Sequence, residues 1–267
     1  MWGCALSLAR SLTPIAHVGP PMTLSDGDTM GTVCDLGQFD HVVEIGSGLG
    51  ALGLAIHRHL ILLHTNVGRE DYRHDNSPPL PPKRTKVTLT DYVPELLGAL
   101  RQSAREAAAA IDDGQGRRST SAPLSVERLE WHSAADNDGG EDLAWICPGE
   151  SLLIVGSEVI YEPLQAEALS GCIRRMLTKS GVWLTSRVIL ANGADRSGWL
   201  EFIRRMRRMK VGGDGDGLAV QCATSSPFGR CDHDANGPDV GEDAMLLDIE
   251  FVKAGPGHSG ALHMAEG

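Results

Sequence analysis

Short apolar runs alternate with stretches of helical periodicity along most of this chain. The apolar runs predict seven strands, at 41–45, 86–90, 126–130, 151–156, 182–188, 217–223 and 245–252. Apolar residues spaced three and four positions apart predict helices at 49–63, 94–111, 163–178 and 195–210. Because strands that alternate with helices form parallel βαβ units, the pattern predicts an α/β fold. Its sheet is expected to be seven-stranded and mostly parallel, with helices on both faces.

The C-terminal part of the pattern departs from this alternation. No helical stretch separates the strands predicted at 217–223 and 245–252. They are therefore expected to pair antiparallel, as a C-terminal hairpin beside one edge of the sheet. Seven strands with this ending make one domain, which we place at 37–253.

Polar stretches interrupt or flank this domain. Residues 64–85 contain the run SPPLPPKR, residues 133–142 are acidic, and residues 224–242 are rich in glycine and aspartate. All three predict exposed loop insertions. Residues 1–36 are expected to form an N-terminal cap or a poorly ordered segment, and residues 254–267 a flexible tail.

The helix predicted at 195–210 has a strongly two-sided pattern. Its apolar residues fall on one face, at Trp199, Phe202, Ile203, Met206 and Met209. This stripe is expected to be buried. The arginines between these positions then form the solvent-exposed face, so we do not interpret the basic run as a nucleic-acid-binding site.

The composition is typical of a soluble globular protein. Of the 267 residues, 42% are apolar and 22% are charged, which is enough apolar residue to form a core. No run reaches the roughly 18 apolar residues that a membrane-spanning helix needs. Acidic residues outnumber basic ones by 35 to 24, and the resulting net charge of −11 argues against nucleic-acid binding and suits a cationic partner.

The six cysteines show no CxxC spacing, which indicates the reduced thiols of an intracellular protein. A cytoplasmic location is expected, with a nuclear one left open. Residues 1–25 contain one arginine and no acid, so a role in organelle targeting also stays open. Cys222, Cys231 and His233 match no zinc spacing, and no metal site is predicted.

A glycine-rich loop follows the first predicted strand. The strand HVVEI runs into the sequence GSGLG at 46–50, and a predicted helix comes next. Glycines in this position allow a tight turn and let backbone N–H groups approach a ligand closely. The spacing GxGxxA from residue 46 fits the pyrophosphate loop of a dinucleotide-binding protein. A loop with an acid at the strand end, here Glu44, also fits S-adenosylmethionine, whose cationic portion the acid would face, so both cofactors stay open.

Asp91 ends the second predicted strand. Both cofactors contain a ribose, and a carboxylate at this place accepts hydrogen bonds from the two ribose hydroxyls. Asp91 follows Gly46 by 45 positions, and the insertion at 64–85 accounts for the long separation. Asp91 is equally suited to capping the next helix, whose first turn contains Pro94.

Two further motifs follow the next strands, L-E-W at 129–131 and S-E-V-I-Y-E-P at 157–163. They come after E-x-G-S-G-x-G from residue 44 and T-D-Y-x-P-E-L-L from residue 90. In this order the four motifs resemble the seven-β-strand class I S-adenosylmethionine-dependent methyltransferases. The likeness is to the protein-lysine methyltransferase group with a [D/E]-x-x-Y motif after the fourth strand, and it spans most of the chain. It implies a Rossmann-like fold with S-adenosyl-L-methionine as the cofactor.

The resemblance also implies a role for each motif residue. The residues implied to bind the cofactor are Glu44, Gly46, Ser47 and Gly48 at its methionine end, Asp91 at the ribose, Glu130 and Trp131 beside the adenine, and Ser157 beneath it. Glu158 and Tyr161 are implied to be the catalytic residues that meet the target amine. Purely structural roles stay open for Trp131 in the core, Ser157 in a turn and Tyr161 in packing.

The leading hypothesis is therefore a protein-lysine N-methyltransferase, whose partner is a protein with a target lysine and not a nucleic acid or a membrane. Other hypotheses stay open because the family carries a Trp in a helix before the first strand, whereas the only upstream Trp here is Trp2. One is a methyltransferase for a small amine, a nitrogen heterocycle or a histidine. Another is a cofactor-binding module without turnover. The last is an NAD-dependent oxidoreductase, in which S-E-V-I-Y has no role.

Overall fold

The computed structural model describes most of the predicted domain. The described residues are 34–70, 84–109, 122–132, 143–193, 196–209, 218–225 and 244–253, together with Ala5, Leu8, Ala9 and Leu12. The strands are β1 (His41–Glu44), β2 (Lys86–Asp91), β3 (Leu124–Arg128), β4 (Leu152–Ser157), β5 (Arg187–Gly193), β6 (Leu218–Ser225) and β7 (Ala244–Lys253). The helices are η1 (Leu36–Gln38), α2 (Ala51–Glu70), α3 (Pro94–Ala109), α5 (Pro163–Ser180) and α6 (Ser197–Arg208).

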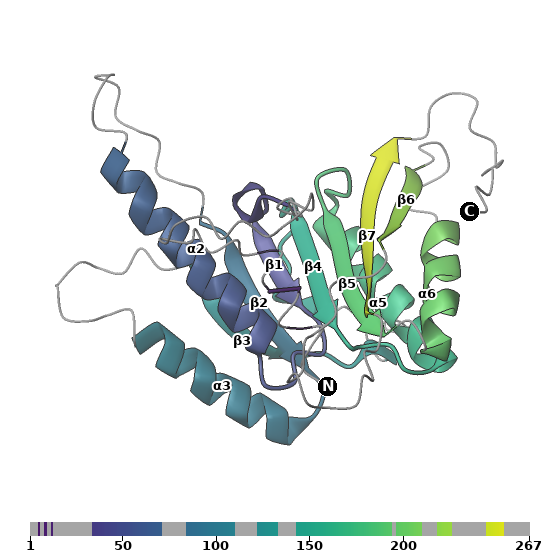
Figure 1. Ribbon diagram of the computed structural model, residues 1–267, viewed down its shortest axis with the longest axis horizontal. Coiled ribbons are helices and arrows are strands. Elements are labelled where there is room, and N and C mark those ends of the chain that lie inside the picture. The colour runs from purple at the N-terminus through teal and green to yellow at the C-terminus, as the bar shows by residue number, and fades with distance from the viewer. Residues whose placement is uncertain are drawn as a thin grey trace, which may run out of the picture.

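Seven strands form one sheet in the order β3-β2-β1-β4-β5-β7-β6. The strands from β3 to β5 in this order are parallel to their neighbours. Strand β7 lies between β5 and β6 and is antiparallel to both, so β6 forms the edge. The prediction of a mostly parallel seven-stranded sheet with a C-terminal antiparallel pair is confirmed (Figure 1).

Helices cover both faces of this sheet, as predicted. Val42 packs in a core cluster with side chains of α2 and α3, whereas its neighbour Val43 packs in a second cluster with side chains of α5 and α6. Leu153 and Ile154 of β4 divide between the two clusters in the same way. Successive strand side chains point to opposite faces, so each apolar run supplies both cores at once.

The predicted stripe of α6 is confirmed. Trp199, Phe202, Ile203 and Met206 are buried, and Met209 packs against the same cluster. Arg204, Arg207 and Arg208 on the other face are exposed.

The predicted position of the fifth strand was wrong. The run at 182–188 was expected to form it, but the structure places β5 at Arg187–Gly193. Ser186 donates a hydrogen bond from its backbone N–H to the Trp183 carbonyl at 2.9 Å, so this segment turns, and Leu184 is 47% exposed. The strand instead uses the completely buried run 188–191, because a parallel strand between two helical layers needs apolar side chains on both faces.

Other predicted boundaries also shift. Helix α2 continues to Glu70, although residues 64–85 were predicted to be an irregular loop. The prediction took Asn66 and Gly68 as breaks, but single residues of these types cost a helix only about 1 kcal/mol, whereas proline ends it. Strand β3 begins and ends two residues earlier than predicted, at Leu124–Arg128.

Part of the N-terminal region contributes to the core. Leu8 and Leu12 are helical and fully buried, and both belong to the cluster on the α2 side, as do Leu36 and Phe39. The predictions for most of 1–36, for the insertion at 133–142, for most of 224–242 and for the tail lie outside the described residues.

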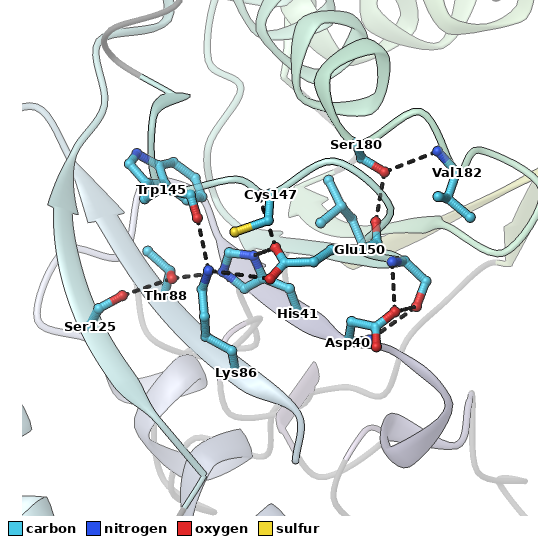
Figure 2. A network of polar contacts seen from close by, with 12 residues as sticks. Asp40, His41, Lys86, Thr88, Ser125, Trp145, Cys147, Glu150, Ser180 and Val182 are labelled. Carbon is cyan, nitrogen blue, oxygen red and sulfur yellow. Dashed lines mark hydrogen bonds and ion pairs between the residues drawn. The ribbon is translucent and has the colours of Figure 1, made fainter. Parts of the chain in front are cut away.

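A polar network ties together the amino ends of β1, β2 and β4 (Figure 2). His41 bonds Glu150 through Nδ1 at 3.2 Å and Thr88 through Nε2 at 2.7 Å. Lys86 donates to the Trp145 carbonyl at 2.8 Å, and its Nζ lies 3.7 Å from the Glu150 carboxylate. The loop before β4 is thereby fixed at the amino ends of β1 and β2.

Burial, together with the nearby Lys86 charge, lowers the pKa of His41 to about 4, against the opposing effect of Glu150. The imidazole is therefore neutral in the folded protein at neutral pH. Its side chain is completely buried, so protonation would place a cation in the sheet core.

The described residues give two further findings. Cys34, Cys147 and Cys172 are free thiols. None of the helices in the described part of the chain has the length and apolar content to cross a bilayer.

We expect the stability of the protein to fall between pH 6.5 and pH 4 because of His41. In the unfolded chain this histidine takes up a proton near pH 6.5, whereas the folded protein excludes that proton until about pH 4. Above pH 6.5 His41 is neutral in both states and does not lower the free energy of unfolding. As the pH falls from 6.5 to 4, the free energy of unfolding decreases by up to about 3 kcal/mol. Urea denaturation of the wild type and of His41→Gln at several pH values measures this decrease in the free energy of unfolding. The gap between the two free energies of unfolding should change with pH, and a constant gap would contradict the assignment.

Candidate functional site

The predicted site residues gather at the carboxyl ends of the parallel strands. Here β1 and β4 are neighbours, while the chain leaves β1 toward β2 on one side and leaves β4 toward β5 on the other. In open α/β sheets, ligands bind at such a reversal of strand order. In Figure 1 this edge lies at the bottom of the sheet, where the arrowhead of β5 ends.

The loop after β1 has the tight turns that its glycines predict. Gly46, Gly48 and Gly50 all adopt positive φ, at 61°, 56° and 81°. A Cβ at Gly46 would lie 2.8 Å from the Val159 side chain and 3.6 Å from the Trp131 ring, so the loop passes directly beside both residues. A Cβ at Gly48 would meet no heavy atom within 4 Å. Gly46 therefore packs against the neighbouring loops, while Gly48 faces open space.

Ser47 joins this loop to the end of β2. Its backbone N–H donates to the Thr90 carbonyl at 2.8 Å, and its hydroxyl accepts a hydrogen bond from the Thr90 N–H at 3.0 Å. The same hydroxyl donates to the Glu44 carbonyl at 3.3 Å. Ser47 thus fixes the start of the loop against two strands.

Asp91 contacts the loop and its own turn. Its Oδ2 accepts a hydrogen bond from the Gly48 N–H at 3.0 Å. Its Oδ1 accepts from Tyr92 N–H at 2.8 Å and from Val93 N–H at 3.0 Å, directly before α3. The carboxylate therefore organises the turn into the helix and the glycine loop together.

Glu44 lies under the first turn of α2. Its Oε2 accepts a hydrogen bond from the Gly53 N–H at 3.1 Å, and the residue is 4% exposed. Burial raises the pKa of Glu44 to about 8, with a smaller increase from the Asp91 charge, while hydrogen bonds from Ser47 and Gly53 oppose the rise. In this structure Glu44 carries its proton at neutral pH and supports the turn between loop and helix.

Two residues of the L-E-W motif, Glu130 and Trp131, lie in different surroundings. Trp131 is partly buried, packs against the core cluster on the α5 side and lies beside Gly46. Glu130 forms an ion pair with Arg128 at 2.9 Å, and the two side chains are 45% and 60% exposed, respectively. Trp131 is therefore close to the loop, whereas Glu130 faces solvent.

The turn after β4 contains the S-E-V-I-Y motif and is unusually constrained. Glu158 adopts φ 53°, a left-handed conformation that non-glycine residues rarely take and that costs on the order of 1 kcal/mol. Its N–H donates to the Ala191 carbonyl at 2.9 Å. Among the described residues, the Ser157 hydroxyl is buried without a hydrogen-bond partner. A buried hydroxyl of this kind is suited to a polar group of a ligand.

Asn192, at the end of β5, holds this turn in place. Its Nδ2 donates to the Ile160 carbonyl at 2.7 Å, and its Oδ1 accepts from the Ile160 N–H at 3.3 Å. The side chain is completely buried. Both backbone groups of Ile160 are thus satisfied by one amide, which stabilises the strained turn around Glu158.

Arg196, just before α6, contacts both predicted catalytic residues. Its Nε lies 3.9 Å from Glu158 Oε2, and its guanidinium lies 4.9 Å from the centroid of the Tyr161 ring. The Glu158 side chain is 12% exposed and the Tyr161 residue is 39% exposed. The carboxylate and the ring thus already bind a cation in this structure.

Sequence reasoning missed Asn192 and Arg196. The predicted fifth strand ended at 188, so Asn192 was not recognised as a strand-end residue beside Ser157 and Glu158. With the strand at its true position, a polar residue directly after the apolar run 188–191 would have indicated this edge of the sheet. Arg196 fell within the helix predicted at 195–210 and was assigned no role.

A groove of about 430 Å³ lies between the N-terminal halves of α5 and α6. Leu164 and Leu200 line it and are 64% and 61% exposed. No group of three or more His, Cys, Asp or Glu side chains within the described ranges is placed to hold a metal ion.

Comparison with known proteins gives a likeness at the level of solved structures. A scan against protein-family models and a search of curated proteins both give no match. An O-methyltransferase from Bacillus cereus, in complex with SAH, is 10% identical, with 80% of this chain and 76% of that chain covered and a TM-score of 0.44. The precorrin-6y C5,15-methyltransferase of Geobacter metallireducens is 10% identical over 82% and 84%, with a TM-score of 0.42. The N-methyltransferase NodS of Bradyrhizobium japonicum is 14% identical over 79% and 85%, with a TM-score of 0.41.

These TM-scores lie below 0.5, so the likeness carries no argument about function. What the chain does is argued below from its own residues.

The close packing of α6 on the turn after β4 can be tested at Gly198. A Cβ there would lie 2.4 Å from the Glu162 carbonyl oxygen, so Gly198→Ala should lower the free energy of unfolding by about 1–3 kcal/mol. Gly98 in α3 is the matched control, because a Cβ there meets nothing within 4 Å. Gly98→Ala should raise the free energy of unfolding by about 0.5–1 kcal/mol. Urea denaturation compares the two, and equal effects of the same sign would contradict the packing.

Proposed function

We propose that this protein is an S-adenosylmethionine-dependent methyltransferase that acts on an amine, and that the amine is a lysine side chain of a protein. The observation that carries the proposal is the meeting of four motifs at the reversal of strand order. Gly46 lies beside both Trp131 and Val159, and Gly48 donates a hydrogen bond to Asp91. The ordered motifs that resemble the methyltransferase group thus come from four strand ends and lie side by side.

The residues present fit the proposed cofactor at its ribose. Asp91 accepts three backbone hydrogen bonds, and a carboxylate has about four acceptor positions. One acceptor position therefore remains for a ribose hydroxyl. The open space beside Gly48 gives a ligand access to the same carboxylate.

Other residues would contribute around this point. Trp131 supplies an aromatic surface beside the loop for the adenine, with Glu130 at its outer border. The buried Ser157 hydroxyl, which has no hydrogen-bond partner among the described residues, would meet a polar group of the cofactor. Ser47 and Glu44 hold the loop toward the methionine end, and the proton on Glu44 would be lost more readily beside the cationic portion of the ligand.

The bound cofactor would supply a methyl group on a sulfonium and would be left as a neutral thioether. The target ammonium would first lose one proton to water, because only a neutral amine nitrogen has the lone pair that accepts the methyl group. A lysine amine has an ordinary pKa near 10.4 and reaches the site as a cation. Glu158 attracts that cation, and Tyr161 binds it by a cation–π interaction worth about 0.5–2 kcal/mol. We assign these two side chains to binding and orientation, because too strong an ion pair would hold the proton on the amine.

Binding measurements separate the cofactor hypotheses. Calorimetry should detect binding of S-adenosylmethionine and of its demethylated product, and no binding of NAD. Asp91→Asn should raise the dissociation constant of both by about tenfold or more, because a hydrogen bond to a charged acceptor is lost. The exposed Glu106→Gln serves as the control and should leave the dissociation constant unchanged. Binding of NAD alone would refute the proposal.

Transfer measurements test the amine side of the site. Radiolabelled S-adenosylmethionine and proteins from a cell lysate give the rate of transfer. Glu158→Gln and Tyr161→Ala should each reduce it by about tenfold, the equivalent of one lost cation contact. The control is Glu167→Gln on α5, whose exposed ion pair with Arg205 contributes little. Full activity in both site variants would show that the two residues do not meet the substrate.

A further inference from the structure

The cation site formed by Glu158 and Tyr161 is filled by a residue of the protein itself. The Arg196 guanidinium covers the Tyr161 ring at 4.9 Å, and its Nε lies 3.9 Å from the Glu158 carboxylate. These are the two groups that the proposed function assigns to a substrate cation. Two cations a few ångströms apart repel each other, so the arginine and a substrate ammonium cannot both bind there.

The backbone that follows Arg196 packs closely on the turn after β4, whereas the Arg196 side chain reaches solvent. Gly198 packs against the Glu162 carbonyl, and the Ser197 hydroxyl donates to the Tyr161 carbonyl at 3.4 Å. The start of α6 is thereby held on the turn that contains Glu158. The Arg196 side chain is 30% exposed and has several rotatable bonds, so it can leave the site while the backbone stays in place.

We propose that Arg196 is a specificity-determining residue, a resident cation that a substrate must displace from Glu158 and Tyr161. This inference rests on the proposed function, because it assigns the same site to an amine. The planar guanidinium suits a carboxylate and an aromatic face better than an ammonium does. A free small amine therefore competes poorly with Arg196. A lysine on a protein displaces Arg196 because the rest of that protein makes additional contacts with the surface. The site therefore selects protein side chains over small amines.

Removal of the resident cation should open the site to small amines. In Arg196→Gln the Glu158 carboxylate no longer has the arginine charge beside it and attracts an external cation more strongly. Nα-acetyl-lysine amide is the probe, and its dissociation constant, measured by NMR titration, should fall by about tenfold relative to the wild type. The probe acetylated on Nε carries no charge and should show no such gain.

Two further variants make the result specific. Arg208→Gln removes an exposed arginine at the far end of α6 and should leave the dissociation constant of the probe unchanged. Arg196→Lys keeps a resident cation and should show less gain than Arg196→Gln. Thermal unfolding of each variant confirms that it is folded. A purely structural role for Arg196 predicts equal or weaker binding of the probe in Arg196→Gln, and that result would overturn the proposal.

The experiment is independent of the cofactor. A protein that binds S-adenosylmethionine but shows no gain of amine binding in Arg196→Gln keeps the proposed function and loses this inference. A protein that shows the gain but binds no S-adenosylmethionine keeps the cation site and loses the transferase assignment.

Discussion

The close approach of two chain segments at the middle of the sheet determines the rest of the site. The loop after β1 passes so near the turn after β4 that a single methyl group at Gly46 would come within 2.8 Å of Val159. Only glycine permits this approach, at a positive φ that also turns the chain toward α2. The same approach brings the end of β3, through Trp131, against the loop. Three strand ends are thus joined around one backbone position.

The turn after β4 depends on a second constraint, which comes from β5. Glu158 has an unfavourable backbone conformation, and the hydrogen bonds that surround it compensate for the strain. Asn192 binds both backbone groups of Ile160, and Gln165 accepts hydrogen bonds from the N–H groups of Tyr161 and Glu162. The direction of the Glu158 side chain is therefore set by residues from β5 and α5. Strain of this kind persists where the surrounding structure fixes it, and it is common at sites of function.

Features that follow from hydrophobic periodicity could be predicted from the sequence, whereas the exact bounds of the fifth strand and the contacts between distant segments could not. The stripe from Trp199 to Met206 was readable because helical spacing alone decides which face is buried. The position of Asp91 at the end of a strand could be predicted because it directly follows the run predicted to form that strand. Asn192 was not, since two apolar runs compete for the fifth strand and only burial by both helical layers favours the second. The contact of Arg196 with Glu158 joins segments 38 positions apart, and no local pattern reports such a pairing.

The close packing of α6 on the turn after β4 has a kinetic consequence. Exchange of one cation for another at Glu158 needs only rotation about side-chain bonds, because Gly198 and Ser197 keep the helix where it is. Rotamer changes of partly exposed side chains take picoseconds to nanoseconds, far less than the microseconds to milliseconds of hinged loops. Under the proposed function, entry of a substrate cation at Glu158 would be fast, and the slow step of turnover would lie elsewhere.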